Sequence, residues 1–171
     1  MKLKPLYLLV LLLITTTSFA TTTPTEEAQE KRIKSHFILS ITKYLEWSEG
    51  NHELTLGVIS NNDEMYNIMT SLASARKSSK KITVKNYSNL SEIEGCNILF
   101  ITKEGGLSAN QIQQLDNKNL LVITEDDEIS SSGSINLVKV DGKLMFEINR
   151  DMVNKTGIKM ASRLMDLAIV K

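Results

Sequence analysis

Few residues of this chain have the types and spacing that catalysis requires. Enzymes generally use a nucleophile beside a base, paired carboxylates, a metal cluster or a phosphate-binding turn. The two histidines, His36 and His52, do not lie at ligand spacing from a cysteine or a carboxylate. The single cysteine, Cys96, opens an apolar stretch and has no basic residue near it except Lys103. We therefore expect no catalytic residue, no metal site and no cofactor, and we interpret Cys96 as a buried structural thiol.

An acidic run offers a weaker binding signal. Four consecutive acids, Glu125 to Glu128, follow the apolar run Leu120 to Ile123. In open α/β sheets, ligands bind beyond the carboxyl ends of parallel strands, and carboxylate oxygens suit hard cations. A solvated loop is the simpler interpretation of such a run. The pair Gly105-Gly106 matches no phosphate-binding glycine pattern and is interpreted as a loop.

Aromatic and charged residues supply the candidates for protein or ligand contact. Tyr44 and Trp47 end the first expected helix, and aromatic rings with a polar atom are frequent at binding surfaces. A position in the core is an equal alternative for Trp47. Glu147 alternates with apolar neighbours and so faces away from them. We expect it near Arg163 of the last helix, as a structural ion pair or as part of a ligand pocket.

Alternating helix and strand patterns must position these residues. Apolar residues spaced at three and four predict helices, whereas short continuous apolar runs predict buried strands. The expected elements are a helix at 31–47, a strand at 54–59, a helix over Met65 to Leu72, an edge strand at 82–84, a central strand at 96–102, a short helix opened by a capping box of Ser108 and Gln111, a strand at 120–123, a hairpin around Asp141-Gly142 and a helix at 158–169. This order predicts an α/β fold: a single three-layer domain with a mixed, mostly parallel sheet, a C-terminal antiparallel hairpin and helices on both faces.

The first residues predict export. A positive start at Lys2 and Lys4, an apolar run from Leu6 to Ile14 and small residues up to Ala20 are typical of a secretory signal peptide. We expect residues 1–20 to be this peptide, cleaved after Ala20. A retained membrane anchor ranks second, because the apolar run is shorter than the roughly 20 residues that span a bilayer. Residues 21–30 are then a polar lead-in and residues 31–171 the domain.

Composition excludes several classes of protein. The chain has 171 residues, 42% of them hydrophobic, which suffices for one domain with a core. Without its leader it carries about two more acidic than basic residues, so we expect no nucleic-acid or anionic-lipid surface. A single cysteine forms no internal disulfide and lies too far from the leader to carry a lipid. The mature protein is therefore expected not to insert into a membrane.

Several motifs follow one another in a defined order along the chain. They are Gly133, the Ile-Asn-Leu of 135–137, the Phe-Glu-Ile-Asn of 146–149, Gly157 and the Ser-Arg-Leu of 162–164. This series resembles the C-terminal signature of the YfiR/HmsC-like family of periplasmic regulators. The segment 36–47 is similar to the family's opening helix, which ends in a hydrophobic residue, Glu and Trp, and Cys96 with the following Ile-Leu-Phe-Ile resembles its central strand. The resemblance covers nearly the whole mature chain.

The resemblance implies a regulator and not an enzyme. Characterised members restrain an inner-membrane diguanylate cyclase through its periplasmic sensor domain. We therefore expect the partner to be an inner-membrane signalling protein, either a diguanylate cyclase or a histidine kinase, and a homodimer is a further option. Asn149 belongs to the family pattern together with Glu147 and Arg163, and it joins Tyr44 and Trp47 as a candidate for partner or ligand binding. The family's cysteine pairs are missing here, so redox control by an internal disulfide does not carry over.

Two other functions stay open. A sheet of this order has a crevice beyond its strand ends, expected near Thr102 to Glu104 and Thr124 to Asp126. The protein is therefore alternatively a soluble periplasmic small-molecule-binding protein, and a ligand that controls partner binding would combine both functions. A hydrolase whose serine, aspartate and histidine are assembled by the fold ranks third.

Overall fold

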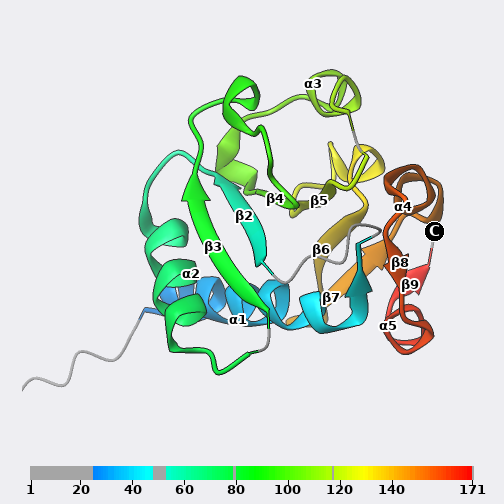
Figure 1. Cartoon of the computed structure of the whole chain (residues 1–171). Coiled ribbons are helices and arrows are strands. Elements are labelled where there is room, and N and C mark those ends of the chain that lie inside the picture. Colours follow the sequence, from blue (N-terminus) through cyan, green and yellow to red (C-terminus); the bar gives the residue numbers. More distant parts are fainter. Residues whose placement is uncertain (1–24, 48–52, 79, 117, 171) are drawn as a thin grey trace, which may run out of the picture.

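The computed structural model describes residues 25–47, 53–78, 80–116 and 118–170. Its centre is a seven-stranded sheet with the strand order β3-β2-β4-β5-β6-β7-β9 (Figure 1). The strands are β2 (Glu53–Ile59), β3 (Lys81–Asn86), β4 (Ile98–Ile101), β5 (Leu121–Thr124), β6 (Ile135–Val140), β7 (Lys143–Ile148) and β9 (Ile169–Val170). Strands β6 and β7 pair antiparallel, and the other neighbouring strands of this sheet pair parallel. The mixed, mostly parallel sheet with its antiparallel hairpin confirms the predicted fold class.

Helices cover both faces of the sheet. They are α1 (Glu26–Ile41), α2 (Glu64–Ala75), α3 (Ala109–Gln113), α4 (Arg150–Thr156) and α5 (Ser162–Asp166). A separate two-stranded sheet pairs β1 (Leu45–Glu46) with β8 (Lys159–Met160). Helices α1 and α2 pack on one face, whereas α3 packs on the other. Figure 1 shows α4, β8, α5 and β9 gathered beside β7, at the end of the sheet opposite β3.

Strand residues alternate between two apolar cores. In β4, Ile98 and Phe100 pack in the cluster beneath α1 and α2, whereas Leu99 and Ile101 pack in the cluster that includes Ile112 of α3. All five side chains are fully buried. Successive side chains of a strand point to opposite faces, so a strand that is covered on both faces is apolar throughout. This arrangement explains why β4 and β5 read as continuous apolar runs.

The first helix begins and ends earlier than its apolar spacing predicts. The Thr25 hydroxyl accepts a hydrogen bond from the Ala28 N–H at 3.2 Å, and α1 starts at Glu26, inside the expected polar lead-in. It stops at Ile41, after which a 3-10 turn leads into β1. The prediction that Tyr44 and Trp47 end this helix is therefore wrong. The chain extends here because β1 pairs with β8, a contact between residues more than a hundred positions apart.

The last predicted helix, at 158–169, is also wrong in extent. Gly157 adopts the left-handed conformation (φ +72°) that ends α4, as the glycine that closes a helix commonly does. The chain then forms β8, and the N–H of Ala161 donates to the carbonyl oxygen of Tyr44 at 2.9 Å. Only the short α5 is helical before the chain joins the sheet as β9. Pairing with β1 and β7 thus overrides the helical spacing of the apolar residues.

Three local predictions are confirmed. Asp141 and Gly142 both have positive φ, +49° and +75°, as the two-residue turn between β6 and β7 requires. Ser108 and Gln111 form the capping box that opens α3. The lysine-rich strand β3 lies at an edge of the sheet.

Some predictions lie outside the described residues. They concern the signal peptide 1–20, the first part of the polar lead-in and His52. Among the helices of the described ranges, none is long and apolar enough to cross a membrane.

Candidate functional site

A crevice lies at the carboxyl ends of β2, β4 and β5. From β2 the chain passes through α2 to β3 on one side, and from β4 it passes through α3 to β5 on the other, with α2 and α3 on opposite faces of the sheet. Open α/β proteins bind their ligands where the strand order reverses in this way. Thr102, Glu104 and Glu125 line the crevice, which confirms the predicted location. We call it the switch-point crevice.

Charged and polar side chains line the switch-point crevice, which has a volume of about 460 Å³. Helix α1 contributes Glu26, Glu27, Glu30, Lys31 and Lys34, helix α2 contributes Met65, and the residues after the strands contribute Ser60, Asn62, Thr102, Glu104 and Glu125. A second cavity of about 650 Å³ shares Glu26, Glu30, Lys34, Glu104 and Glu125 with it and adds apolar side chains, among them Ile33, Leu137 and Leu144.

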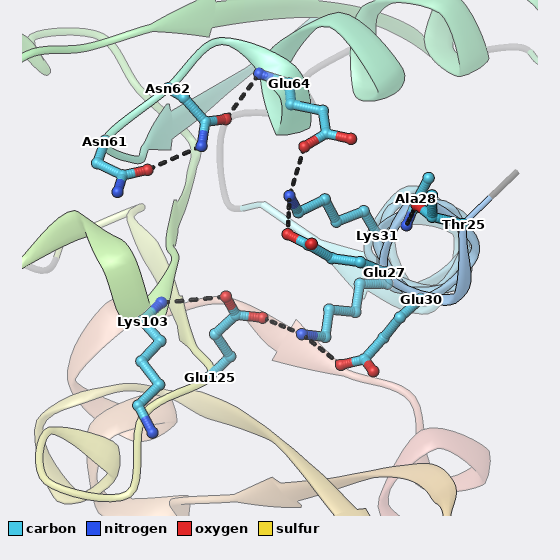
Figure 2. A network of polar contacts seen from close by, with 11 residues as sticks. Thr25, Glu27, Ala28, Glu30, Lys31, Asn61, Asn62, Glu64, Lys103 and Glu125 are labelled. Carbon is cyan, nitrogen blue, oxygen red and sulfur yellow. Dashed lines mark hydrogen bonds and ion pairs between the residues drawn. The ribbon is translucent and has the colours of Figure 1, made fainter.

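Lys34 ties α1 to the ends of two strands. Its Nζ lies 2.7 Å from Glu125 Oε2 and 2.9 Å from Glu30 Oε1. Glu125 follows β5, and its Oε1 accepts a hydrogen bond from the Lys103 backbone N–H at 3.0 Å (Figure 2). Glu30 also lies 2.9 Å from the Nζ of Lys139 in β6. The Glu125 side chain is 6% exposed and that of Lys34 16%, so this ion pair is largely shielded from water.

Lys31 forms a similar bridge one turn earlier. It contacts Glu27 on its own helix at 2.7 Å and Glu64 at the start of α2 (Figure 2). We call Lys31, Lys34 and their carboxylate partners the lysine clasp. The helical spacing of Glu27 to Lys31 and of Glu30 to Lys34 is a signal that sequence reasoning overlooked, because a glutamate four residues before a lysine stabilises a helix.

The ion pairs shift the ionisation of the lysine clasp. Contacts with Lys34 and Lys139 hold the pKa of the Glu30 carboxyl below its usual value. Burial lowers the pKa of the Lys34 ammonium, but its contacts with Glu125 and Glu30 outweigh burial and raise it. Glu27 and Glu64 raise the pKa of Lys31 in the same way. Glu30, Lys31 and Lys34 are therefore charged at neutral pH.

Thr102 borders the crevice at the end of β4. Its side chain is almost fully buried, with 2% of the residue exposed, and its Oγ1 has no hydrogen-bond partner within the described ranges. An unsatisfied buried hydroxyl is uncommon in folded proteins. Sequence reasoning placed Thr102 at the crevice but gave no sign that its hydroxyl would lack a partner.

Among the predicted site residues, Tyr44 and Arg163 come together at the surface. Both are exposed, and the backbone of Tyr44 bonds to Ala161, two residues before Arg163. Trp47, in contrast, is 5% exposed. Its Nε1 donates to the Asn119 carbonyl oxygen at 3.1 Å, and the Lys80 Nζ lies 5.5 Å from the ring centre. Its burial favours the alternative that Trp47 is a core residue.

Glu147 belongs to a polar row that crosses three strands. The Thr124 hydroxyl donates to Asn136 Oδ1 at 2.8 Å, and Asn136 Nδ2 donates to Glu147 Oε2 at 3.3 Å. Thr124 and Asn136 are buried and Glu147 is half-buried. The ion pairs between described residues do not include one from Glu147 to Arg163. Glu147 therefore takes part in ordering the sheet.

Asn149 caps a helix. Its side chain accepts a hydrogen bond from the Met152 N–H at 3.2 Å, at the start of α4, and donates one to the Ser131 carbonyl oxygen at 3.0 Å. These two contacts connect the loop before β6 with the helix after β7. The Phe-Glu-Ile-Asn motif therefore ends on a residue with an identifiable structural role.

The thiol of Cys96 is protected from reaction. Burial raises the pKa of Cys96 to about 11, so the thiol is protonated at neutral pH. Its Sγ donates to the Ile98 carbonyl oxygen at 2.9 Å. Elsewhere in the described ranges, no group of three or more His, Cys, Asp or Glu side chains is arranged to hold a metal ion.

Most of the chain matches the model of a known protein family. The family model described as YfiR/HmsC-like matches residues 31–169 of the chain. This range contains the motifs of 133–164, the segment 36–47 and Cys96, so the resemblance drawn from those motifs is confirmed. The comparison with curated proteins gives no match.

Proposed function

The chain belongs to the YfiR/HmsC-like family, and from this premise we propose that it is a periplasmic signalling regulator. It binds and restrains the periplasmic domain of an inner-membrane signalling protein, either a diguanylate cyclase or a sensor histidine kinase. The observation that carries this proposal is the family match across residues 31–169, which extends over both the helical layers and the sheet.

The same premise supports a periplasmic location of the protein and a division of the chain into a signal peptide and one domain. Residues 1–20 are the signal peptide, cleaved after Ala20, and residues 31–171 form one regulatory domain in the periplasm. The helix α1 starts at Glu26, so the structured part of the domain extends into the polar lead-in of 21–30. The protein acts by binding and not by catalysis.

We place the partner-binding surface at the C-terminal corner, defined by Tyr44, Arg163, Leu167 and Ile169. Tyr44, Leu167 and Ile169 are 36%, 61% and 38% exposed, and they are three of the five large hydrophobic residues exposed in the described part of the chain. Exposed apolar side chains beside an arginine are typical of protein-binding surfaces. Ile169 also lies in β9 at the edge of the sheet, where a partner strand can add.

A cellular experiment tests the proposal. Deletion of the gene should raise cyclic-di-GMP, and a tagged copy should capture a diguanylate cyclase from solubilised inner membranes. Capture of a histidine kinase with unchanged cyclic-di-GMP would assign the partner to the second class. If deletion changes nothing and no signalling protein is captured, the regulatory proposal is wrong.

A matched pair of variants tests the surface. Leu167→Asp places a charge at the most exposed apolar side chain of the C-terminal corner, and we expect it to abolish capture. Val140→Asp makes the same type of change at a side chain that is 43% exposed but lies in the β6–β7 hairpin. It should leave capture unchanged. Equal loss of capture in both variants would argue against the C-terminal corner.

A further inference from the structure

We propose that the switch-point crevice binds a small organic cation that carries primary ammonium groups, such as a short diamine. The inference concerns the protein alone and does not depend on the signalling partner proposed above. It rests on three properties of the crevice: the charge of its lining, a buried hydroxyl without a partner and its size.

The charge of the lining favours a cation. Five carboxylates and two ammonium groups border the crevice. Each ammonium group already lies between two carboxylates, Lys31 between Glu27 and Glu64 and Lys34 between Glu30 and Glu125. Glu26 and Glu104 also border the crevice, and the ion pairs of the described ranges include neither. An entering anion would meet excess negative charge, whereas an ammonium group would meet two carboxylates that no lysine neutralises.

The Thr102 hydroxyl supplies a second, independent indication. Thr102 borders the crevice and is 2% exposed, and its hydroxyl has no hydrogen-bond partner in the described ranges. A hydroxyl oxygen has lone pairs that accept hydrogen bonds, and an ammonium group has three donors and no acceptor. A bound ammonium group would therefore satisfy the hydroxyl as well as the carboxylates.

Size and geometry favour an organic cation over a metal ion. The crevice volume of about 460 Å³ lies in the range of sites that bind small organic molecules. A metal ion needs several ligands converging on one point, and no group of three or more His, Cys, Asp or Glu side chains in the described ranges provides them. A diamine carries two separated ammonium groups, so it suits carboxylates that are spread around a cavity.

Calorimetric titration with three molecules of equal chain length tests the class of ligand. We expect 1,4-diaminobutane to bind, and neither 1,4-butanediol nor succinate to bind. Binding should weaken as salt is added, because the attraction is between charges. Equal binding of the diol, preferential binding of succinate, or no binding of the diamine by calorimetry and by thermal shift would each overturn the proposal.

Variants locate the site. Glu104→Gln and Thr102→Val should each weaken diamine binding about tenfold, the effect of losing one hydrogen bond to a charged group. Thr102→Val removes a hydroxyl without a described partner and keeps the side-chain shape, so the fold should remain intact. Glu128→Gln is the control, because Glu128 is exposed and lines neither of the two cavities at α1. Unchanged binding in both test variants, or equal weakening in the control, would overturn the proposed site.

Hydrogen exchange adds a readout that does not depend on the heat of binding. The diamine should increase amide protection in residues 26–34, which contribute five side chains to the crevice. Increased protection confined to the C-terminal corner would place the ligand elsewhere and contradict the proposal.

Discussion

The two halves of α1 are attached to the rest of the protein by different forces. The C-terminal half buries Ile38, Leu39 and Ile41 in the core, where at most 2% of each residue is exposed. The N-terminal half is held over the switch-point crevice by the lysine clasp, with Lys31 and Lys34 as its two centres. One continuous helix is thus attached by apolar packing at its C-terminal end and by ion pairs at its N-terminal end.

The two kinds of attachment respond differently to salt and pH. Burial of apolar surface is the dominant stabilising term in folding and is insensitive to pH. Ion pairs that are partly open to water contribute less, and both salt and protonation weaken them. The C-terminal half is therefore suited to fix the helix, whereas the N-terminal half can loosen or tighten when a ligand or partner changes the charges around the crevice.

The largest effect is expected in the apolar C-terminal half of α1. Ile38→Ala removes a fully buried side chain and should lower the free energy of unfolding by about 2–5 kcal/mol, measured by urea denaturation. Ile33→Ala on the same helix is the control, since Ile33 is 49% exposed and should cost about 0.5 kcal/mol or less. Similar costs for the two variants would remove the distinction between the halves.

A smaller effect is expected at the buried ion pair. Glu125→Ala leaves Lys34 with Glu30 as its one remaining carboxylate partner and should cost about 2 kcal/mol. The double variant Lys34→Met with Glu125→Met should recover most of this loss, because an apolar pair has no charge left unpaired. Asp127→Ala, an exposed acid in the same loop, serves as the control. Equal loss in the single and double variants would show that the charge pair is not the cause.

The Lys31 ion pairs of the lysine clasp should contribute less to the free energy of unfolding, because their carboxylates are more exposed. Lys31→Ala removes contacts with Glu27 and Glu64, whose side chains are 76% and 46% exposed, and should cost about 0.2–1 kcal/mol. The cost should shrink in 1 M salt. Arg32→Ala, at the neighbouring exposed position, should show neither the cost nor the salt dependence. A salt-independent cost for Lys31→Ala would contradict an electrostatic attachment.

The smallest effect is expected from pH. The pKa of Glu30 is lowered, so its contribution is present above the usual value of 4.5 and is lost as pH falls through the lower folded-state pKa. The pKa of Lys34 is raised, so its contribution is present below 10.5 and is lost as pH rises through the higher folded-state pKa. Amide protection of residues 26–34, corrected for intrinsic exchange, should therefore fall below about pH 4.5 and stay constant near neutrality. In Glu30→Gln the decrease in amide protection at acidic pH should be smaller. An equal decrease in residues 38–41 of the unaltered protein would contradict the difference between the two halves of α1.

Local features of the sequence predicted much of the fold. Asp141-Gly142 predicts its hairpin because both positions need positive φ, and Ser108 with Gln111 predicts its capping box through contacts three residues apart. The apolar runs predict the buried strands because both faces of the sheet are covered. The location of the crevice is predicted for a related reason, since Thr102 and Glu125 follow apolar runs and ligands bind beyond the carboxyl ends of parallel strands.

Other features required the tertiary structure. The end of α1 and the short α5 depend on the pairing of β1 with β8, which brings residue 45 to residue 160. The lysine clasp needs Glu64 and Glu125, which follow different strands and approach α1 only in the folded chain. The burial of Trp47 likewise depends on Asn119, 72 positions away.

By itself, the sequence determined the fold class, the turn chemistry and the family of this protein, because these depend on neighbouring residues and on the alternation of apolar positions. Only the tertiary structure decided which charges meet at the crevice, which aromatic side chains stay exposed and where the terminal helices stop. Those outcomes depend on contacts between distant segments, whose free energies exceed the modest local preference of a short segment for helix or strand.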